Sequence, residues 1–399
     1  MTAISTPGPE LLDAAIGRQG ETVELRRAIH AEPELGLDLP DTQAKILESL
    51  TGLGMNITTG TATTSVVADL DSGRPGPTVL LRADMDALPM QEDNDTGFQS
   101  IHEGRMHACG HDAHVSMLVT AARLIADNKG ELTGKIRFMF QPGEEGHAGA
   151  QVMLDEGLLD GGVDRAFAIH IISNMPRGAL LSRGGALMAS ADTFNITVHG
   201  KGGHASMPHG CVDPIPTAAA TVTGLQTMVG RNMNANDPSV VTVAHIEAGS
   251  TNNVIPETAW MEGTIRALSE RTRSDLHAGI VRVAESTAAA HGCSCTAEIE
   301  PGYPVTINDQ GQVDLADAVA TDVFGEGAFI QMPTPIMGAE DWSYVLQKVP
   351  GSMAFLGACP VGEDPRTTAP NHSNYMRIDE DSMDRGAAMY AAMALARPA

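Results

Sequence analysis

Hydrophobic and polar positions alternate with two different periods along the outer parts of the chain. Apolar residues at helical spacing predict helices over residues 9–31, 42–53 and 115–126, and again over 313–323, 341–347 and 380–396. β-rich runs predict strands over residues 65–70, 78–82, 135–140, 165–171 and 352–356. Pro33 is expected to end the first helix, and Asp41 is the expected N-cap of the second. Strands that alternate with helices are typical of a layered α/β fold with a mainly parallel sheet.

The pattern changes between residues 187 and 301. Strands are predicted over 191–199, 240–246, 258–266 and 294–299, and helices over 214–229 and 272–290. This β-α-β-β-α-β order is the ferredoxin-like arrangement. We therefore predict an α/β domain built from residues 1–186 and 302–399, with an α+β domain of residues 187–301 inserted into it. The two halves of the outer domain must meet, so residues distant in sequence can share one site.

Composition and charge exclude several classes of partner. The 399 residues include 25 basic and 50 acidic side chains, for a formal net charge of −25, which argues against nucleic acid and anionic membranes as partners. We expect no membrane span, since no run of about 18 apolar residues occurs. The first residues lack the apolar core of a secretory signal. The five cysteines do not have the spacing of a disulfide framework. We therefore expect free thiols and a cytoplasmic location.

The most concentrated candidate chemistry lies in Met106–His114, which holds three imidazoles, one thiol and one carboxylate. Only Gly110 separates Cys109 from His111, and a sharp turn at this glycine would let both side chains converge on one point. Thiolate and imidazole are ligands that transition metals prefer. Taken alone, one Cys-x-His pair is more often a chance cluster in a loop.

Other metal ligands are expected where predicted strands end. Glu144 and Glu145 follow the strand over 135–140, His170 ends the strand over 165–171, and His372 lies in a Pro-Asn-His turn. Each of these has an ordinary structural explanation by itself. With Cys109 and His111 they supply five donors and a spare carboxylate, which suits two metal ions about 3.5–4 Å apart. One glutamate can then bind metal while its neighbour acts as general base.

Several motifs in one order resemble the M20 metallopeptidase family, and Met106–His114 resembles its amidohydrolase branch. That branch includes hippurate hydrolases, N-acyl-amino-acid amidohydrolases and plant auxin-conjugate hydrolases. The resemblance runs from about Arg26 to Arg377, and the matching pieces are Leu80–Pro89, Gln141–Gly146, Gly200–His209, Asn253–Pro256, Gly338–Trp342 and Asn371-His372. It implies a zinc-peptidase-like catalytic domain with an inserted lid and dimerisation domain.

The resemblance also implies a role for each matching residue. The implied metal ligands are Cys109 (bridging), His111, Glu145, His170 and His372, and Glu144 would be the general base and acid. Asp86 and Asp112 would orient ligating imidazoles. His204 of the inserted domain would reach across a homodimer to stabilise the oxyanion on the other subunit. Asn253 and Arg266 would help to hold the carboxylate of the substrate.

The implied activity is hydrolysis of the amide bond of N-acyl amino acids by two divalent ions, which could be Mn, Zn, Co or Ni. Dipeptidase or N-acetyl-diaminopimelate deacetylase activity is the alternative within the same class. A non-catalytic metal-dependent binding protein and an enzyme with Cys109 as nucleophile are alternatives from other classes. The segments 171–176 and 250–252 depart from the family pattern, and we expect them to line the substrate pocket.

Overall fold

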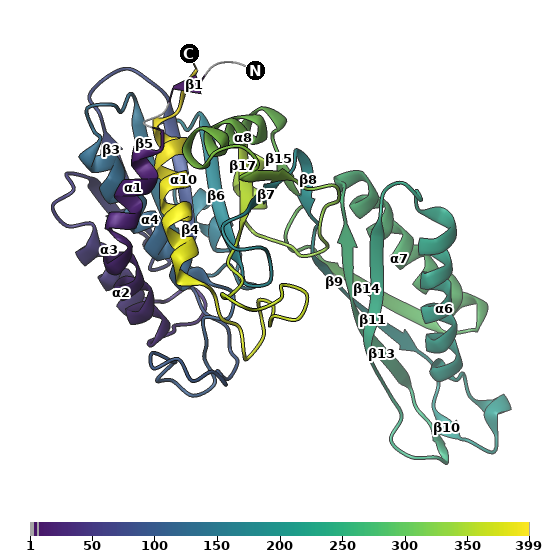
Figure 1. Cartoon of the computed structure of the whole chain (residues 1–399). Coiled ribbons are helices and arrows are strands. Elements are labelled where there is room, and N and C mark those ends of the chain that lie inside the picture. Colours follow the sequence, from purple (N-terminus) through teal and green to yellow (C-terminus); the bar gives the residue numbers. More distant parts are fainter. Residues whose placement is uncertain (1–3, 6–7, 399) are drawn as a thin grey trace. The chain divides into compact units, whose positions relative to one another are not determined.

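The computed structural model describes residues 4–5 and 8–398, and the chain divides into two compact units (Figure 1). The first unit comprises Met1–Gly185, Ile307–Pro333 and Tyr344–Ala399. The second comprises Ala186–Thr306 and Thr334–Ser343. The second unit thus includes a short returning segment, Thr334–Ser343, that lies outside the inserted stretch expected from the sequence. The elements β8 (Gly185–Met188), β15 (Thr306–Asn308) and α9 (Ser343–Leu346) lie where the chain passes between the units.

An eight-stranded mixed sheet forms the centre of the first unit, in the order β16-β7-β17-β6-β4-β5-β3-β2. The strands are β2 (Asn56–Thr59), β3 (Val66–Asp71), β4 (Thr78–Asp84), β5 (Lys135–Gln141), β6 (Arg165–Ile172), β7 (Leu180–Ser182), β16 (Phe329–Gln331) and β17 (Gly351–Gly357). The central strands β17, β6, β4 and β5 are parallel, whereas β3, β2 and β7 pair antiparallel with their inner neighbours. The carboxyl ends of the parallel strands therefore meet at one edge.

Helices cover this sheet and bury a large apolar core. They are α1 (Glu10–Gly17), α2 (Gln19–His30), α3 (Pro40–Ser49), α4 (His111–Asp127), α5 (Gly149–Asp155), α8 (Gln310–Phe324) and α10 (Met383–Leu395), which follows the 3₁₀ turn η2 (Glu380–Ser382). Helices α4 and α10 pack against each other and against β4 and β6 (Figure 1). The short strands β1 (Ile4–Ser5) and β18 (Arg397–Pro398) pair with each other.

The second unit is a ferredoxin-like α+β layer. Its elements are β9 (Asp192–His199), α6 (Pro214–Asn232), β11 (Ser239–Ala248), β13 (Thr258–Ala267), α7 (Glu270–Ala290) and β14 (Ser294–Glu300). The strands form an antiparallel sheet in the order β11-β13-β9-β14, and α6 and α7 bury a separate core against it. A two-stranded ribbon of β10 (Gly203–His204) and β12 (Val254–Ile255), with the 3₁₀ turn η1 (Pro208–Gly210), completes the unit.

Several element boundaries differ from the sequence prediction. The stretch 9–31 forms two helices because Arg18, at φ −103° and ψ 4°, interrupts the helical backbone between them. Helix α3 begins with Pro40 at its first position and has Leu39 as N-cap, so Asp41 is not the cap. The last helix begins at Met383 after a 3₁₀ turn. Helix α5 and edge strand β2 were not predicted, since both are too short for a periodic signal.

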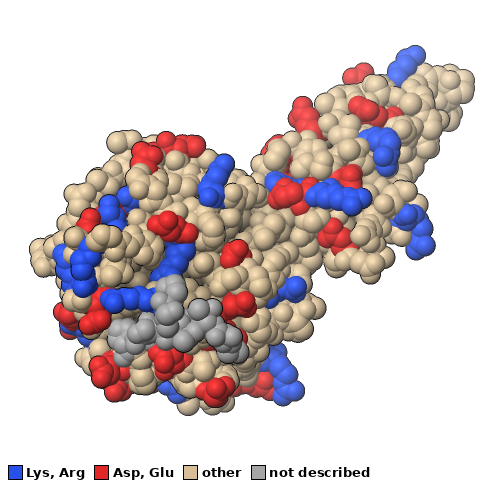
Figure 2. Space-filling model, turned by 90° about the horizontal axis from the view of Figure 1, so that it is seen from above, with Lys and Arg blue, Asp and Glu red and all other residues tan. Residues whose placement is uncertain are grey.

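Charged groups are mixed on the face shown in Figure 2, where Lys and Arg lie among the more numerous Asp and Glu. On this face the net charge of −25 is therefore not gathered into one acidic field. Among the described residues, no helix combines the length and the apolar character that crossing a membrane requires.

Candidate metal centre

The backbone turn that carries Cys109 and His111 depends on Gly110. This residue has φ 91° and ψ 15°, a left-handed conformation, and is the N-cap of α4. A Cβ atom at this position would lie 2.4 Å from Cγ2 of Ile171. Both the conformation and the close approach therefore require glycine. The turn places Cys109 just before α4 and His111 at its first residue, both almost completely buried.

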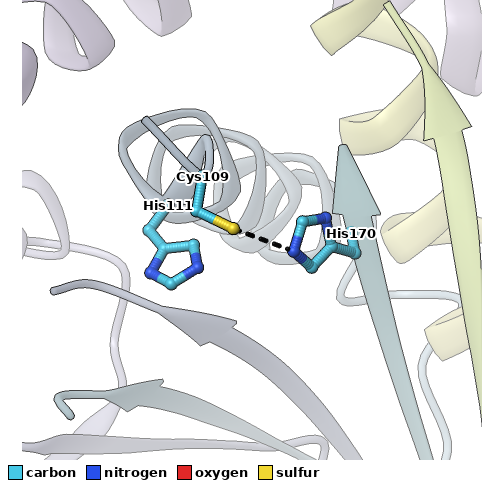
Figure 3. Close-up of side chains that lie close together, drawn as sticks. All are labelled: Cys109, His111 and His170. Carbon is cyan, nitrogen blue, oxygen red and sulfur yellow. Dashed lines mark hydrogen bonds between the residues drawn. The ribbon is translucent and has the colours of Figure 1, made fainter. Parts of the chain in front are cut away.

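Two imidazoles from distant segments meet the Cys109 sulfur. Its Sγ lies 3.3 Å from Nε2 of His170, at the end of β6, and 3.3 Å from Nε2 of His372. Figure 3 shows the Cys109 sulfur directed at His170 of β6, with His111, the first residue of α4, close to Cys109. Ligands of one tetrahedral zinc ion stand about 3.5 Å apart. These separations therefore match those of two ligands on a common ion.

Cys109 belongs to two overlapping groups of potential ligands. One group is Cys109, His111 and His170, and the other is Cys109, Glu145 and His372; within each, the ligand atoms lie within 4.8 Å of one another. The predicted ligands therefore come together, with one sulfur common to both groups.

The two adjacent glutamates are positioned by the carboxylate of Asp86. Its Oδ1 accepts a hydrogen bond from the Glu144 amide at 2.9 Å, and its Oδ2 accepts one from the Glu145 amide at 3.0 Å. The Glu145 carboxylate lies 3.2 Å from Nε2 of His372, and Glu144 is buried. Asp86 also contacts a predicted metal ligand: Nδ1 of His111 lies 2.8 Å from its main-chain carbonyl and 3.6 Å from its carboxylate. The backbone makes the shorter contact to the imidazole, while the carboxylate orients the two glutamate amides.

Main-chain carbonyls set the tautomers of two imidazoles. His111 Nδ1 bonds to the Asp86 carbonyl at 2.8 Å, and His170 Nδ1 bonds to the Ile171 carbonyl at 2.9 Å. Because a carbonyl can only accept, both Nδ1 atoms carry a proton, which leaves Nε2 as the atom of each ring that can bind a metal. Burial would lower the pKa of His111, but Asp84 and Cys109 hold it well above its usual value, so a bound ion would replace a proton on Nε2. This Nε2 atom is buried and has no hydrogen-bond partner among the described residues, which fits the position of a metal ligand.

Electrostatics in the cluster also favour a bound cation. Burial raises the pKa of the Cys109 thiol, although His111 opposes this shift. Burial holds the pKa of His170 well below its usual value, so its imidazole is neutral. Hydrogen bonds to Cys109 and Glu145 raise the pKa of His372 to about 10. A divalent ion would supply the positive charge that a buried thiolate needs, so the residues present fit such an ion.

A buried ion network lies beside the cluster, and its acidic member is Asp84. Asp84 at the end of β4 contacts Arg82 at 2.6 Å, Nδ1 of His114 at 2.5 Å and Nε2 of His111 at 3.5 Å. His114 Nε2 accepts the Ile171 amide at 2.7 Å. Burial would raise the pKa of Asp84, but Arg82 and the histidines hold it well below its usual value. Asp84 ends a buried strand, at the edge of the sheet where open α/β folds collect functional groups.

Asp112 belongs to a different buried network, which corrects its predicted role. Its Oδ2 lies 2.9 Å from Nε of Arg26 and 2.8 Å from Nδ1 of His30. The imidazole that Asp112 orients is therefore His30 and not a predicted metal ligand. Glu92 lies 3.2 Å from the other ring nitrogen of His30. The neighbouring His107 is fully buried, and burial lowers its pKa to about 3.

The remaining predicted residues lie in the second unit. His204 and Asn253 share the β10–β12 ribbon, where the Ala205 amide donates to the Asn253 carbonyl at 3.0 Å. Both side chains are exposed. Arg266 is half-buried near the far end of β13 from this ribbon, and burial lowers its pKa. His204 and Arg266 are thus not neighbours within one copy of the second unit.

A thiol, imidazoles and carboxylates gathered at the carboxyl ends of parallel strands fit the site of a metal-dependent hydrolase. The family model "Peptidase family M20/M25/M40" matches residues 80–396. The chain belongs to this family and is a metal-dependent amidohydrolase or peptidase.

Known proteins resemble the chain over most of its length. The thermostable carboxypeptidase 2 of Saccharolobus solfataricus is 39% identical and is matched over 94% of each chain. The N-acetyl-L-cysteine deacetylase of Bacillus subtilis is 38% identical over 84% of this chain and 80% of its own. A solved structure of a dinuclear metal-binding M20 peptidase from Bacillus subtilis has a TM-score of 0.82 at 31% identity, covering 95% of this chain and 98% of that one. These relatives support a centre of two divalent ions.

Proposed function

We propose that the protein hydrolyses the amide bond of N-acyl amino acids to a carboxylic acid and a free amino acid. The observation that carries this proposal is the sharing of Cys109 by two groups of potential ligands, with the buried Glu144 beside them. The similarity to a deacetylase of N-acetyl-L-cysteine supports the substrate class.

In this proposal Cys109, His111, Glu145, His170 and His372 hold two divalent ions, with Cys109 as the bridging ligand. Such ions polarise a carbonyl and lower the pKa of water from about 15.7 to about 7. The donor set admits Mn, Zn, Co or Ni, since affinity order alone does not select among them.

Glu144 is proposed as the general base and acid. The Asp86 carboxylate accepts a hydrogen bond from the Glu144 amide and so orients the Glu144 backbone next to Glu145. The Glu144 carboxylate lies close to potential ligand atoms of His111 and Glu145. Glu144 takes a proton from the attacking water as the oxygen adds to the carbonyl carbon. It then delivers the proton to the amine nitrogen as the C–N bond breaks.

His204 is proposed as the donor to the oxyanion. Its Nδ1 accepts the Ser206 amide at 3.1 Å and lies 2.8 Å from the Ser206 hydroxyl. Because the amide can only donate, the proton of the neutral ring resides on Nε2, which can donate to a developing oxyanion. Asn253 and Arg266 are proposed to hold the substrate carboxylate.

We further propose that His204 serves the active site of a second copy in a homodimer formed through the second unit. Strand β11 is an edge of its sheet, and among the described residues no strand pairs with its outer side. Val240 and Ile246 on this strand are 38% and 50% exposed. A ten-residue edge strand with exposed apolar side chains favours pairing with another copy. Sedimentation of the wild type and of Ile246→Lys tests this assembly.

The proposed function is tested by a screen of N-acetyl, N-benzoyl and longer N-acyl amino acids. Each substrate is offered to metal-stripped protein with Mn, Zn, Co or Ni added back. Turnover of at least one N-acyl amino acid, abolished by a chelator, is expected. No turnover of any N-acyl amino acid with any metal would contradict the proposal. Activity that survives EDTA would instead favour Cys109 as a nucleophile.

Dipeptidase or N-acetyl-diaminopimelate deacetylase activity is the second candidate. The similarity to a protein named carboxypeptidase favours including dipeptides in the screen. A cytoplasmic location is also proposed, since all five cysteines are free thiols in the structure.

A further inference from the structure

We propose that Asn371 is a positioning residue of the metal centre, whose side-chain amide joins the three segments that carry Cys109, His170 and His372. Its Nδ2 donates to the Cys109 carbonyl at 2.8 Å and to the Ile171 carbonyl at 3.0 Å. Its Oδ1 accepts the Ser173 amide at 3.0 Å. This inference rests on the metal centre of the proposed function and not on its substrate.

The chemistry of its neighbours determines the orientation of this amide. Two carbonyl oxygens can only accept, so they must face the NH₂ group of Asn371. A backbone N–H can only donate, so it must face the Oδ1 atom. All the strong hydrogen-bonding positions of the side chain are thus used, and only asparagine matches this arrangement in length and polarity.

The Ile171 carbonyl links Asn371 directly to a metal-binding imidazole. The same oxygen accepts the Nδ1 proton of His170 at 2.9 Å. Asn371 therefore restrains the carbonyl that orients the His170 ring, and it also restrains the backbone of Cys109. In both cases it acts through another group, because its amide is bonded to backbone atoms.

The third segment is the one that Asn371 shares with His372. His372 has φ 67°, in the left-handed region that non-glycine residues rarely adopt. Its amide donates to the Ala108 carbonyl at 2.8 Å. Such a conformation persists only where its surroundings impose it. The Asn371 side chain and the His372 amide donate hydrogen bonds to adjacent carbonyls, those of Cys109 and Ala108. Together these bonds hold His372 in its left-handed conformation.

Ser173 adds further hydrogen bonds to the contacts that Asn371 makes. It is fully buried, and its hydroxyl lies 2.8 Å from the Ala369 carbonyl and 3.2 Å from Oδ1 of Asn371. The sequence suggested that residues 171–176 line a substrate pocket. The contacts of Ser173 instead tie the end of β6 to the segment before His372.

The test measures binding of Co²⁺ alone to metal-stripped protein by calorimetry and by the visible absorption of the bound ion. Asn371→Ala should weaken the affinity for at least one ion by about 10- to 100-fold and change the absorption bands. Ser173→Ala, which keeps the backbone contact to Oδ1, should give a smaller change in the same direction. Asn374→Ala is the matched control. Asn374 lies in the same segment as Asn371, but its amide donates to the Gln91 carbonyl at 2.6 Å and not to a segment that carries a predicted ligand.

The outcomes separate positioning from a merely structural role. Wild-type Co²⁺ affinity and spectrum in Asn371→Ala, with only a lower melting temperature, would overturn the proposal. If Asn371→Ala does not fold, unchanged Co²⁺ binding in Ser173→Ala would also overturn it. Wild-type protein that binds no Co²⁺ would contradict the metal centre itself, whereas inactivity towards every N-acyl amino acid would contradict only the proposed substrate.

Discussion

The metal centre of the first unit and the β10–β12 ribbon of the second unit hold their functional side chains in opposite ways. At the centre, Cys109, His111 and His170 are buried and tied to carbonyls, carboxylates or each other. On the ribbon, His204 is exposed, and within the part of the chain that the structure describes its ring forms hydrogen bonds only with Ser206. The side chains of the metal centre are held in place by hydrogen bonds. The His204 ring has a fixed tautomer, but its Nε2 donor is left available to a ligand.

Under the proposed function, this difference corresponds to two tasks, metal binding and stabilisation of the oxyanion. Metal ligands must be positioned before the ion arrives, so burial and hydrogen bonds restrain them. An oxyanion donor must let substrate enter and product leave, so it gains from being carried on an exposed element that closes later. The comparison predicts that substitutions in the two regions will fail in different measurements.

The largest effect is expected at Glu144, beside the metal centre of the first unit. Glu144→Ala should lower kcat by about 10⁴-fold, because proton transfer to and from the reacting groups is lost. Metal content, measured by elemental analysis, should stay at two ions. Cys109→Ala should instead lose metal. Near wild-type turnover of Glu144→Ala on every amide tested would show that the assignment is wrong.

The next effect concerns the stability of the first unit beside the metal centre. Asp84→Ala removes a carboxylate that is fully buried between Arg82 and His114. Leaving the Arg82 charge without its partner should destabilise the fold by about 3–5 kcal/mol in denaturant unfolding. The exposed Asp364, paired with Arg366, serves as a control whose replacement should leave the unfolding midpoint unchanged. Equal midpoints for both variants would remove the support for a buried network.

On the ribbon, His204→Ala should lower kcat by roughly 10²–10³-fold, the range for one oxyanion donor. Metal affinity should not change, because His204 lies in the second unit and outside both groups of ligands. Ser206→Ala should have a smaller effect, since the Ser206 amide alone still fixes the tautomer. A loss of metal in His204→Ala would show that the ribbon and the metal centre are not independent.

The smallest effect is a pH dependence of metal binding. Hydrogen bonds to Cys109 and Glu145 raise the pKa of His372 from 6.5 to about 10, so this ring carries a proton at pH 7 when no ion is bound. An ion must displace that proton, and its apparent affinity should therefore rise between pH 7 and about pH 10.

The same shift has the opposite sign for the metal-stripped fold. Stability from protonated His372 is fully present below about pH 6.5 and is lost as the pH rises through about 10.

For the metal-binding effect, calorimetry in buffers of different ionisation enthalpy measures the protons released when the ion binds. An affinity that does not change over this range would contradict the effect.

Short-range patterns predicted much of the centre. The Cys109–Gly110–His111 spacing required a turn, and the structure provides it at Gly110 with φ 91°. Glu144, Glu145 and His170 were expected near strand ends, where parallel strands collect functional groups. The order of strands and helices likewise predicted the α/β architecture of the first unit and the ferredoxin-like architecture of the second.

Contacts between distant residues were not predictable in this way. Nothing near Asp112 indicates that Arg26 and His30 will meet it, since they lie 86 and 82 residues away. Asp86 likewise reaches amides 58 and 59 residues further on. Periodicity describes which face of an element is buried, whereas these pairings depend on how whole elements pack. His372 was a candidate donor in the sequence, but nothing in its Pro-Asn-His turn indicates that it will meet Cys109, which lies 263 residues away.

The shared sulfur of Cys109 has a consequence for how the enzyme fails. Oxidation of this one atom to a sulfenic or sulfinic acid would remove the ligand common to both groups of donors. Peroxide damage should therefore eliminate the whole centre and not half of it. A bound ion engages the thiolate electrons, so metal-loaded protein should resist the reagent longer than stripped protein. Storage with metal and a reductant is the practical result.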